Sequence, residues 1–108
     1  MSKVYVVQEN NRMSYEDAER FGEVVFMTAQ EYKPMKNSLQ NDIILQDIAD
    51  AMEDFDVSED YLILTGNPMV IGFVMHLALM NTNKVNCLQW DRIYNRYREV
   101  EFDVGGVL

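Results

Sequence analysis

The chain has 108 residues and a net charge of −9, and 48% of its residues are hydrophobic while 25% are charged. This length and balance fit one folded domain, residues 1–108, and exclude a disordered chain. No apolar run reaches the roughly 18 residues of a membrane span, and the first residues lack the apolar core of a signal peptide. We therefore expect a cytoplasmic protein that has no contact with a membrane.

The negative charge is concentrated in the middle of the chain. Residues 37–83 contain eight Asp or Glu and no Lys or Arg, whereas the flanking segments are nearly neutral. A field of this sign repels phosphates, so direct binding to nucleic acid is not expected. An acidic face can attract a basic protein surface, although such a charge run is more often a solvated face that maintains solubility.

The elements of the first half follow from local patterns. Residues 3–8 are rich in Val and Tyr and predict a strand. Residues 13–22 predict a short helix that is capped by Ser14, with Asp17 in the capping-box position. Residues 23–28 predict a second strand.

A longer amphipathic helix is predicted from about Ser38 to Phe55. Apolar side chains recur every three or four residues and form one stripe: Ile44, Ile48, Met52 and Phe55. Three aspartates lie on the opposite side: Asp47, Asp50 and Asp54. This acidic outer face is one candidate surface for a protein partner.

The second half predicts three more strands. Residues 61–65 form a continuous apolar run, which is typical of a central strand that is covered on both faces. Asn67 is a good N-cap and Pro68 suits the first position of the helix that follows. Residues 84–90 and 97–103 are joined by a short link, which predicts an antiparallel hairpin.

These elements predict an α/β fold in a single small domain. A strand-helix-strand unit joins parallel strands by a right-handed crossover. We expect a mostly parallel sheet of about five strands with helices packed on it and a C-terminal antiparallel hairpin. The exact strand order does not follow from the sequence.

The segment from Met69 to Met80 has no charged residue, and His76 is its one polar side chain. A helix of a small domain ordinarily has a polar face. Either other parts of the chain cover this helix, or part of it contacts a partner or a second copy in a homodimer. Phe73 and His76 are candidate contact residues, although a lone histidine among apolar residues is more often part of the core.

The turn at Thr65, Gly66 and Asn67 is the best candidate for a ligand site. It joins a buried strand to a helix N-terminus, where ligands gather in open parallel sheets. It lacks the glycine pattern of a dinucleotide site and the lysine of a P-loop, so a purely structural turn is the competing interpretation. In the hairpin, Trp90 and Arg92 could anchor a protein partner or could serve only in cross-strand packing.

No catalytic constellation is present in the sequence. There is no nucleophile elbow, no zinc-protease motif and no second histidine. The single cysteine, Cys87, lies in an apolar segment and is expected to be a small buried hydrophobe rather than a reactive thiol. We identify no catalytic residue, no metal ligands and no cofactor site.

Several segments together resemble a group of short, uncharacterised bacteriophage proteins. They are VYVVQE at 4–9, GEVVF at 22–26, DYLILTGNPMVIG at 60–72 and LQWDR at 88–92. The resemblance covers nearly the whole chain and implies expression inside an infected bacterium, but it brings no assigned activity. Phe73, Met75 and His76 are larger than the residues of the group at these positions, so a shared pocket there is in doubt.

The leading hypothesis is a non-enzymatic protein-interaction module that acts on a host factor. It depends on the acidic middle segment, the uncharged helix and the absence of a catalytic constellation. The alternative is a small-ligand or nucleotide-binding domain with its site at Thr65–Pro68. An enzyme is the least supported of the three, because it would need Cys87, His76 or acidic pairs to converge in a cleft.

Overall fold

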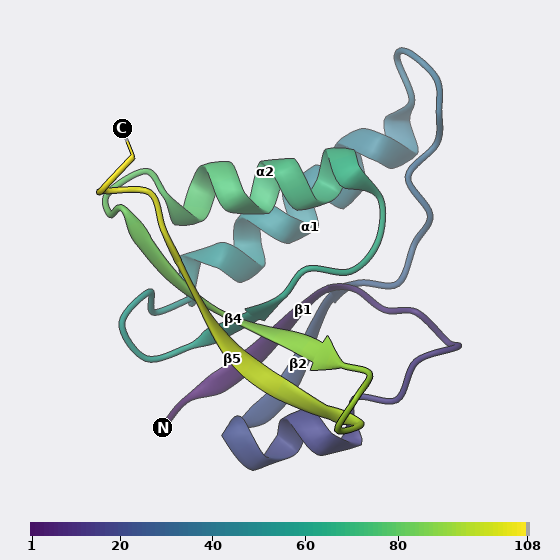
Figure 1. Cartoon of the computed structure of the whole chain (residues 1–108). Coiled ribbons are helices and arrows are strands. Elements are labelled where there is room, and N and C mark those ends of the chain that lie inside the picture. Colours follow the sequence, from purple (N-terminus) through teal and green to yellow (C-terminus); the bar gives the residue numbers. More distant parts are fainter. Residues whose placement is uncertain (108) are drawn as a thin grey trace.

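The computed structural model describes residues 1–107 and contains one five-stranded sheet (Figure 1). The strands are β1 (Lys3–Gln8), β2 (Glu23–Thr28), β3 (Tyr61–Ile63), β4 (Lys84–Asp91) and β5 (Arg96–Asp103). The helices are the 3-10 helix η1 (Glu16–Phe21) and the α-helices α1 (Leu39–Glu53) and α2 (Pro68–Ala78). The strand order is β2-β1-β3-β4-β5, and only β5 is antiparallel to its neighbour. The predicted fold class is therefore confirmed.

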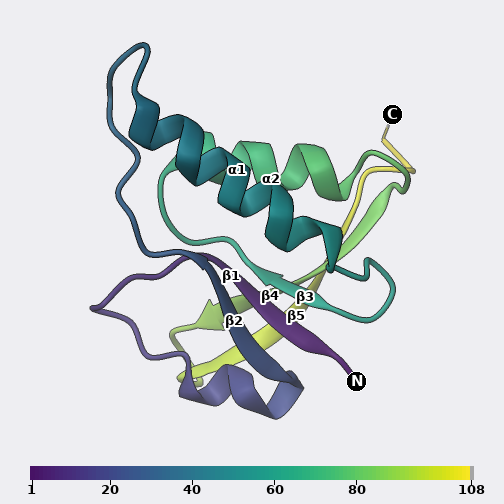
Figure 2. The same cartoon turned by 180° about the vertical axis from the view of Figure 1, so that it is seen from behind.

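Helices lie on both faces of the sheet, with α1 and α2 on one face and η1 on the other (Figure 1, Figure 2). Side chains of a strand alternate between the two faces, and β1 supplies both cores. Tyr5 and Val7 pack with the residues under α1 and α2, whereas Val4 and Val6 pack with those near η1. All four side chains are buried, as expected for a strand covered on both sides.

The helix α1 forms as the periodicity predicts. Ile44 and Ile48 are fully buried against the sheet, and the three aspartates of the outer side are exposed. The Ser38 hydroxyl accepts a hydrogen bond from the backbone N–H of Asn41 (3.2 Å) and caps the first turn. The Asn41 side chain then bonds both backbone groups of Lys33, which holds the preceding loop against the helix.

The start of α2 also agrees with the sequence prediction. Asn67 is the N-cap, and its side-chain oxygen accepts from the backbone N–H of Met69 (2.8 Å). Pro68 occupies the first helical position, where a missing N–H donor has no cost. Val70 and Val74 are buried against the sheet.

One expectation for α2 is wrong. A lone histidine among apolar residues favoured a buried His76, but the side chain is exposed. The helix packs on the sheet and against α1, and its remaining side faces solvent. Met69 and Met80 are 65% and 62% exposed on the helix and just after it, so α2 is not covered all round.

The predicted cap of the first helix is also wrong. Residues 13–22 contain the 3-10 helix Glu16–Phe21, whose N-cap residue is Tyr15 and not Ser14. The Ser14 hydroxyl still accepts from the backbone N–H of Glu16 (3.3 Å), but from one position outside the cap. Asp17 does not form a capping box. Its carboxylate accepts instead from the backbone N–H of Tyr97 in β5 (2.6 Å). This partner lies 80 positions along the chain, so no local sequence pattern predicts it.

The third strand is shorter than predicted and ends at Ile63. A tight turn follows, in which the Thr65 N–H donates to the Ile63 carbonyl (3.1 Å). The Thr65 hydroxyl donates to the backbone carbonyl of Gln8 (2.8 Å) and connects this turn to the end of β1.

Within residues 1–107, every helix is too short or too polar to span a bilayer.

The buried carboxylate of Asp60 links the starts of β1 and β3. The residue is 4% exposed, and its two oxygens accept from the backbone N–H groups of Lys3 and Asp56, each at 2.8 Å. Lys3 and Asp60 are 57 positions apart, so this side chain sets the register between two parallel strands.

Replacing Asp60 by Asn should destabilise the fold. An amide offers one acceptor oxygen instead of two, so one buried N–H loses its partner at a cost of about 1–3 kcal/mol. Urea denaturation followed by circular dichroism measures the free energy of unfolding. Asp47→Asn, on the exposed side of α1, is the matched control and should unfold like the wild type. Equal stability of both variants would contradict the role of Asp60.

Candidate functional site

An apolar groove lies at the carboxyl ends of β3 and β4, and we call it the β3–β5 groove. Its volume is about 730 Å³. It forms because β3 stops at Ile63 while β4 continues to Asp91, and because α1 and α2 pack mainly over β2 and β1. The lining residues are Met13, Ile63, Leu64, Thr65, Cys87, Leu88, Gln89, Trp90, Arg92, Tyr97, Val100 and Phe102.

The groove exposes apolar side chains that a helix would otherwise cover. Val100 and Phe102 of β5 remain 38% and 42% exposed. They are paired with Cys87 and Val85 of β4, so they lie on the face of the sheet that carries α1 and α2. Open apolar surface of this kind is typical of a binding site.

The second wall of the groove belongs to the face of the sheet that carries η1, and it is held rigidly. Trp90 packs edge-on against Tyr97, with ring centroids 5.0 Å apart. Tyr97 is buried, and Asp17 and Arg20 of η1 bond its backbone N–H and carbonyl. Burial raises the pKa of the Tyr97 hydroxyl, which donates to the Ser14 carbonyl and stays protonated near neutral pH. This wall is therefore aromatic and uncharged.

The groove has a positive end. Among its lining residues in the described part of the chain, Arg92 alone carries a charge. The neighbouring Arg98 pairs with Asp91 at 3.4 Å, whereas no carboxylate within residues 1–107 forms an ion pair with Arg92. A guanidinium beside apolar side chains suits a ligand that carries both an apolar group and a carboxylate.

Cys87 lies on the floor of the groove and is buried, as the sequence predicts. Burial raises the pKa of its thiol to about 11. The thiolate is the nucleophilic form of cysteine, and very little of it forms near neutral pH. The groove therefore has no activated sulfur nucleophile.

The predicted ligand turn is divided between two places. Thr65 lines the β3–β5 groove, whereas Gly66 and Asn67 line a separate polar crevice of about 490 Å³ beside Gln8 and Arg12. This crevice lies where the chain reverses direction across the sheet, since β2 and β3 flank β1 on opposite sides. Ligands bind at such switch points in many open α/β sheets.

The backbone amides at the start of α2 already have partners within the protein. The Asn67 N–H donates to the Gln8 side-chain oxygen (2.9 Å), and Met69 donates to the Asn67 side chain. The N–H groups of Val70 and Ile71 donate to the Asn67 carbonyl, and Pro68 has none. The helix N-terminus therefore lacks the unpaired donors that hold a phosphate.

The structure does not bring together all of the predicted interaction residues. Trp90 and Arg92 share the β3–β5 groove. The other five lie on or beside the two α-helices and do not line it: Asp47, Asp50, Asp54, Phe73 and His76. Phe73 is only partly exposed, because it packs against the core.

Most of the groove and one contact beneath the turn do not follow from the sequence. The alternation of β5 identifies Val100 and Phe102 as neighbours on one face, but only the strand order leaves that face open. No pattern in the sequence predicts that Gln8 contacts the turn at Gly66. A Cβ atom at Gly66, where φ is +111°, would lie 2.3 Å from the Gln8 side-chain oxygen.

Within residues 1–107, no cluster of His, Cys, Asp or Glu is arranged to hold a metal ion.

This strand order, with helices on both faces of the sheet, defines a doubly wound α/β domain. The chain belongs to the family described as Phage Pam3 gp32-like protein, which it matches over residues 2–104. The resemblance to bacteriophage proteins is thus confirmed over nearly the whole chain. No curated protein and no solved structure matches the sequence.

Gly66→Ala should destabilise the protein through a clash with Gln8. A Cβ in this backbone conformation is strained, and here it also meets a side chain, so we expect a loss of about 2–4 kcal/mol. The double variant with Gln8→Gly removes the whole side chain, including the Gln8 Cβ atom that would lie 2.5 Å away, and should lose less than the sum of the two single changes. Urea denaturation of the four proteins gives the coupling energy. Simple additivity would mean that the two side chains do not interact.

Proposed function

We propose that this phage protein is a non-enzymatic interaction module that binds a host factor inside the infected cell. The observation that carries the proposal is the β3–β5 groove, which combines an apolar surface with one arginine that has no ion-pair partner in residues 1–107. The partner that fits is a protein segment with an apolar side chain beside an Asp or Glu. The apolar group would pack on Val100 and Phe102, and the carboxylate would bond Arg92.

The chemistry of the lining supports binding rather than turnover. Cys87 is held as a neutral thiol, and the Tyr97 hydroxyl is used inside the fold. The one charged lining residue in the described chain, Arg92, carries a guanidinium, which offers hydrogen-bond donors and no acceptor. Aromatic residues and arginine are also the residue types that most often dominate binding energy at protein interfaces.

The test is a capture experiment with tagged full-length protein and lysate of the bacterium in which the phage grows. Arg92→Glu should abolish capture of any specific partner, because it places a like charge against the partner's carboxylate. Lys36→Glu makes the same change of charge at an exposed loop position and should retain the partner. A partner that binds Arg92→Glu as well as it binds the wild type, or no partner at all, would contradict the proposal.

The position of the crevice beside Gly66 and Asn67 favours a second candidate, a domain that binds a small polar ligand. Because the helix amides are already bonded, such a ligand would be held by side chains, with Arg12 as the one cation in the described lining. Thermal unfolding with a panel of nucleotides and metabolites should then show a raised Tm in the wild type and a smaller rise in Arg12→Ala. An unchanged Tm across the panel would remove this candidate.

A further inference from the structure

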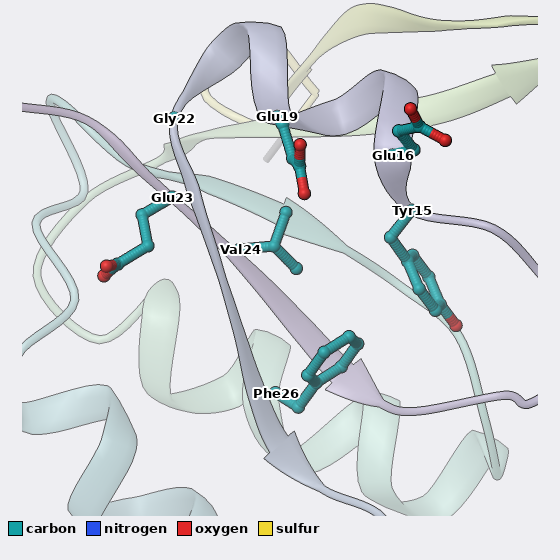
Figure 3. Close-up of a pocket in the computed structure, with 7 residues that line it drawn as sticks. All are labelled: Tyr15, Glu16, Glu19, Gly22, Glu23, Val24 and Phe26. Carbon is teal, nitrogen blue, oxygen red and sulfur yellow. The ribbon is translucent and has the colours of Figure 1, made fainter.

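A second groove lies between η1 and the outer strand β2, on the face of the sheet opposite α1 and α2 (Figure 3). We call it the η1–β2 groove, and its volume is about 760 Å³. Its apolar part consists of Tyr15, Val24 and Phe26, whose two rings pack edge-on with centroids 5.3 Å apart. Phe26 is 41% exposed, so a ring face is open to a ligand.

The rim of this groove is acidic. Glu16, Glu19 and Glu23 are among its lining residues, with no Lys or Arg in the described chain. The Glu16 and Glu19 side chains belong to η1, whereas Glu23 alternates with Val24 along β2 and its side chain points away from the groove (Figure 3). None of the three glutamates forms an ion pair within residues 1–107. Figure 3 shows Glu19 pointing from η1 toward Val24, so a carboxylate lies directly beside the apolar floor. A Lys or Arg side chain fits this arrangement, with its stem on the apolar floor and its charge between carboxylates and aromatic rings.

The strand that forms the floor is an unprotected edge. Both β2 and β5 are edge strands, and an edge presents unpaired backbone groups to other chains. In β5 five of eight residues are charged, which discourages pairing with another strand. In β2, whose sequence is EVVFMT, Glu23 alone is charged and there is no proline. The outer edge of β2 is therefore open to the addition of a strand.

We propose that the η1–β2 groove and the free edge of β2 together bind a basic, extended segment of a partner protein. The backbone of the segment pairs with β2, and alternate side chains reach the groove, where Lys or Arg meets Glu16 and Glu19 of η1. A second copy of this chain is a poor occupant, because pairing β2 with β2 brings the acidic rims of both copies together. This surface lies at the opposite edge of the sheet from the β3–β5 groove, so the inference is independent of the proposed function.

The probe is a fluorescein-labelled peptide of alternating lysine and valine, and its binding to the full-length protein is followed by fluorescence anisotropy. Glu19→Lys should weaken binding by about tenfold or more, because it replaces the carboxylate nearest the apolar floor by a like charge. Asp50→Lys, the same change on the exposed side of α1, should change the affinity by less than about twofold. Phe26→Ala should also weaken binding while the circular dichroism spectrum is retained.

A second peptide separates strand addition from simple charge attraction. Proline at alternate positions keeps the charge of the peptide but removes the backbone donors that pair with an edge strand. This peptide should bind more weakly, and amide shifts in the NMR spectrum caused by the first peptide should map to residues 23–28. Three results would each overturn the proposal: no binding, equal binding to Glu19→Lys and Asp50→Lys, or a dimer in sedimentation that Glu19→Lys strengthens.

Discussion

The right-handed crossovers on either side of β1 determine where every helix lies. The chain first moves outward from β1 to β2 through η1, and then returns past β1 to β3 through α1. Because both crossovers have the same hand, opposite directions of travel place their helices on opposite faces of the sheet. The segment after β3 continues in the second direction, so α2 joins α1 (Figure 2). This is why β1 is buried on both faces and why the two grooves lie at opposite edges of the sheet.

The same constraint leaves the cover of the sheet uneven. Two α-helices pack over the side of the sheet that holds β1 and β2, and residues 1–107 contain no third one for β4 and β5. On the other face, η1 is short and holds the hairpin through hydrogen bonds of Asp17 and Arg20 with the backbone of Tyr97. The β3–β5 groove is the region between these two partial covers. Its shape depends on contacts between segments far apart in the sequence, including the loop residues Met13, Thr65 and Arg92.

The sequence predicted the elements well because their signals are local. Periodicity located the long helix, β propensity located the strands, and Asn67 with Pro68 marked the start of α2. The binding surfaces are not local. Thr65 and Trp90 share a groove only because β3 stops early, and Glu19 lies over Val24 only because η1 folds back onto β2. The exposure of His76 depends on which side of an uncharged helix meets the sheet and α1, and no pattern within that helix carries this information.

The central position of β1 also affects how the protein can be made. The strand is synthesised first, but the neighbour on its inner side, β3, comes 57 residues later. Until Ile63 has left the ribosome, the nascent chain holds β1 and β2 with one edge of β1 unpaired and its Val and Tyr side chains incompletely covered. Such a partly built sheet is prone to associate with neighbouring chains on the same messenger RNA. The sheet can therefore be completed only late in synthesis, after β3 and the C-terminal hairpin have been made.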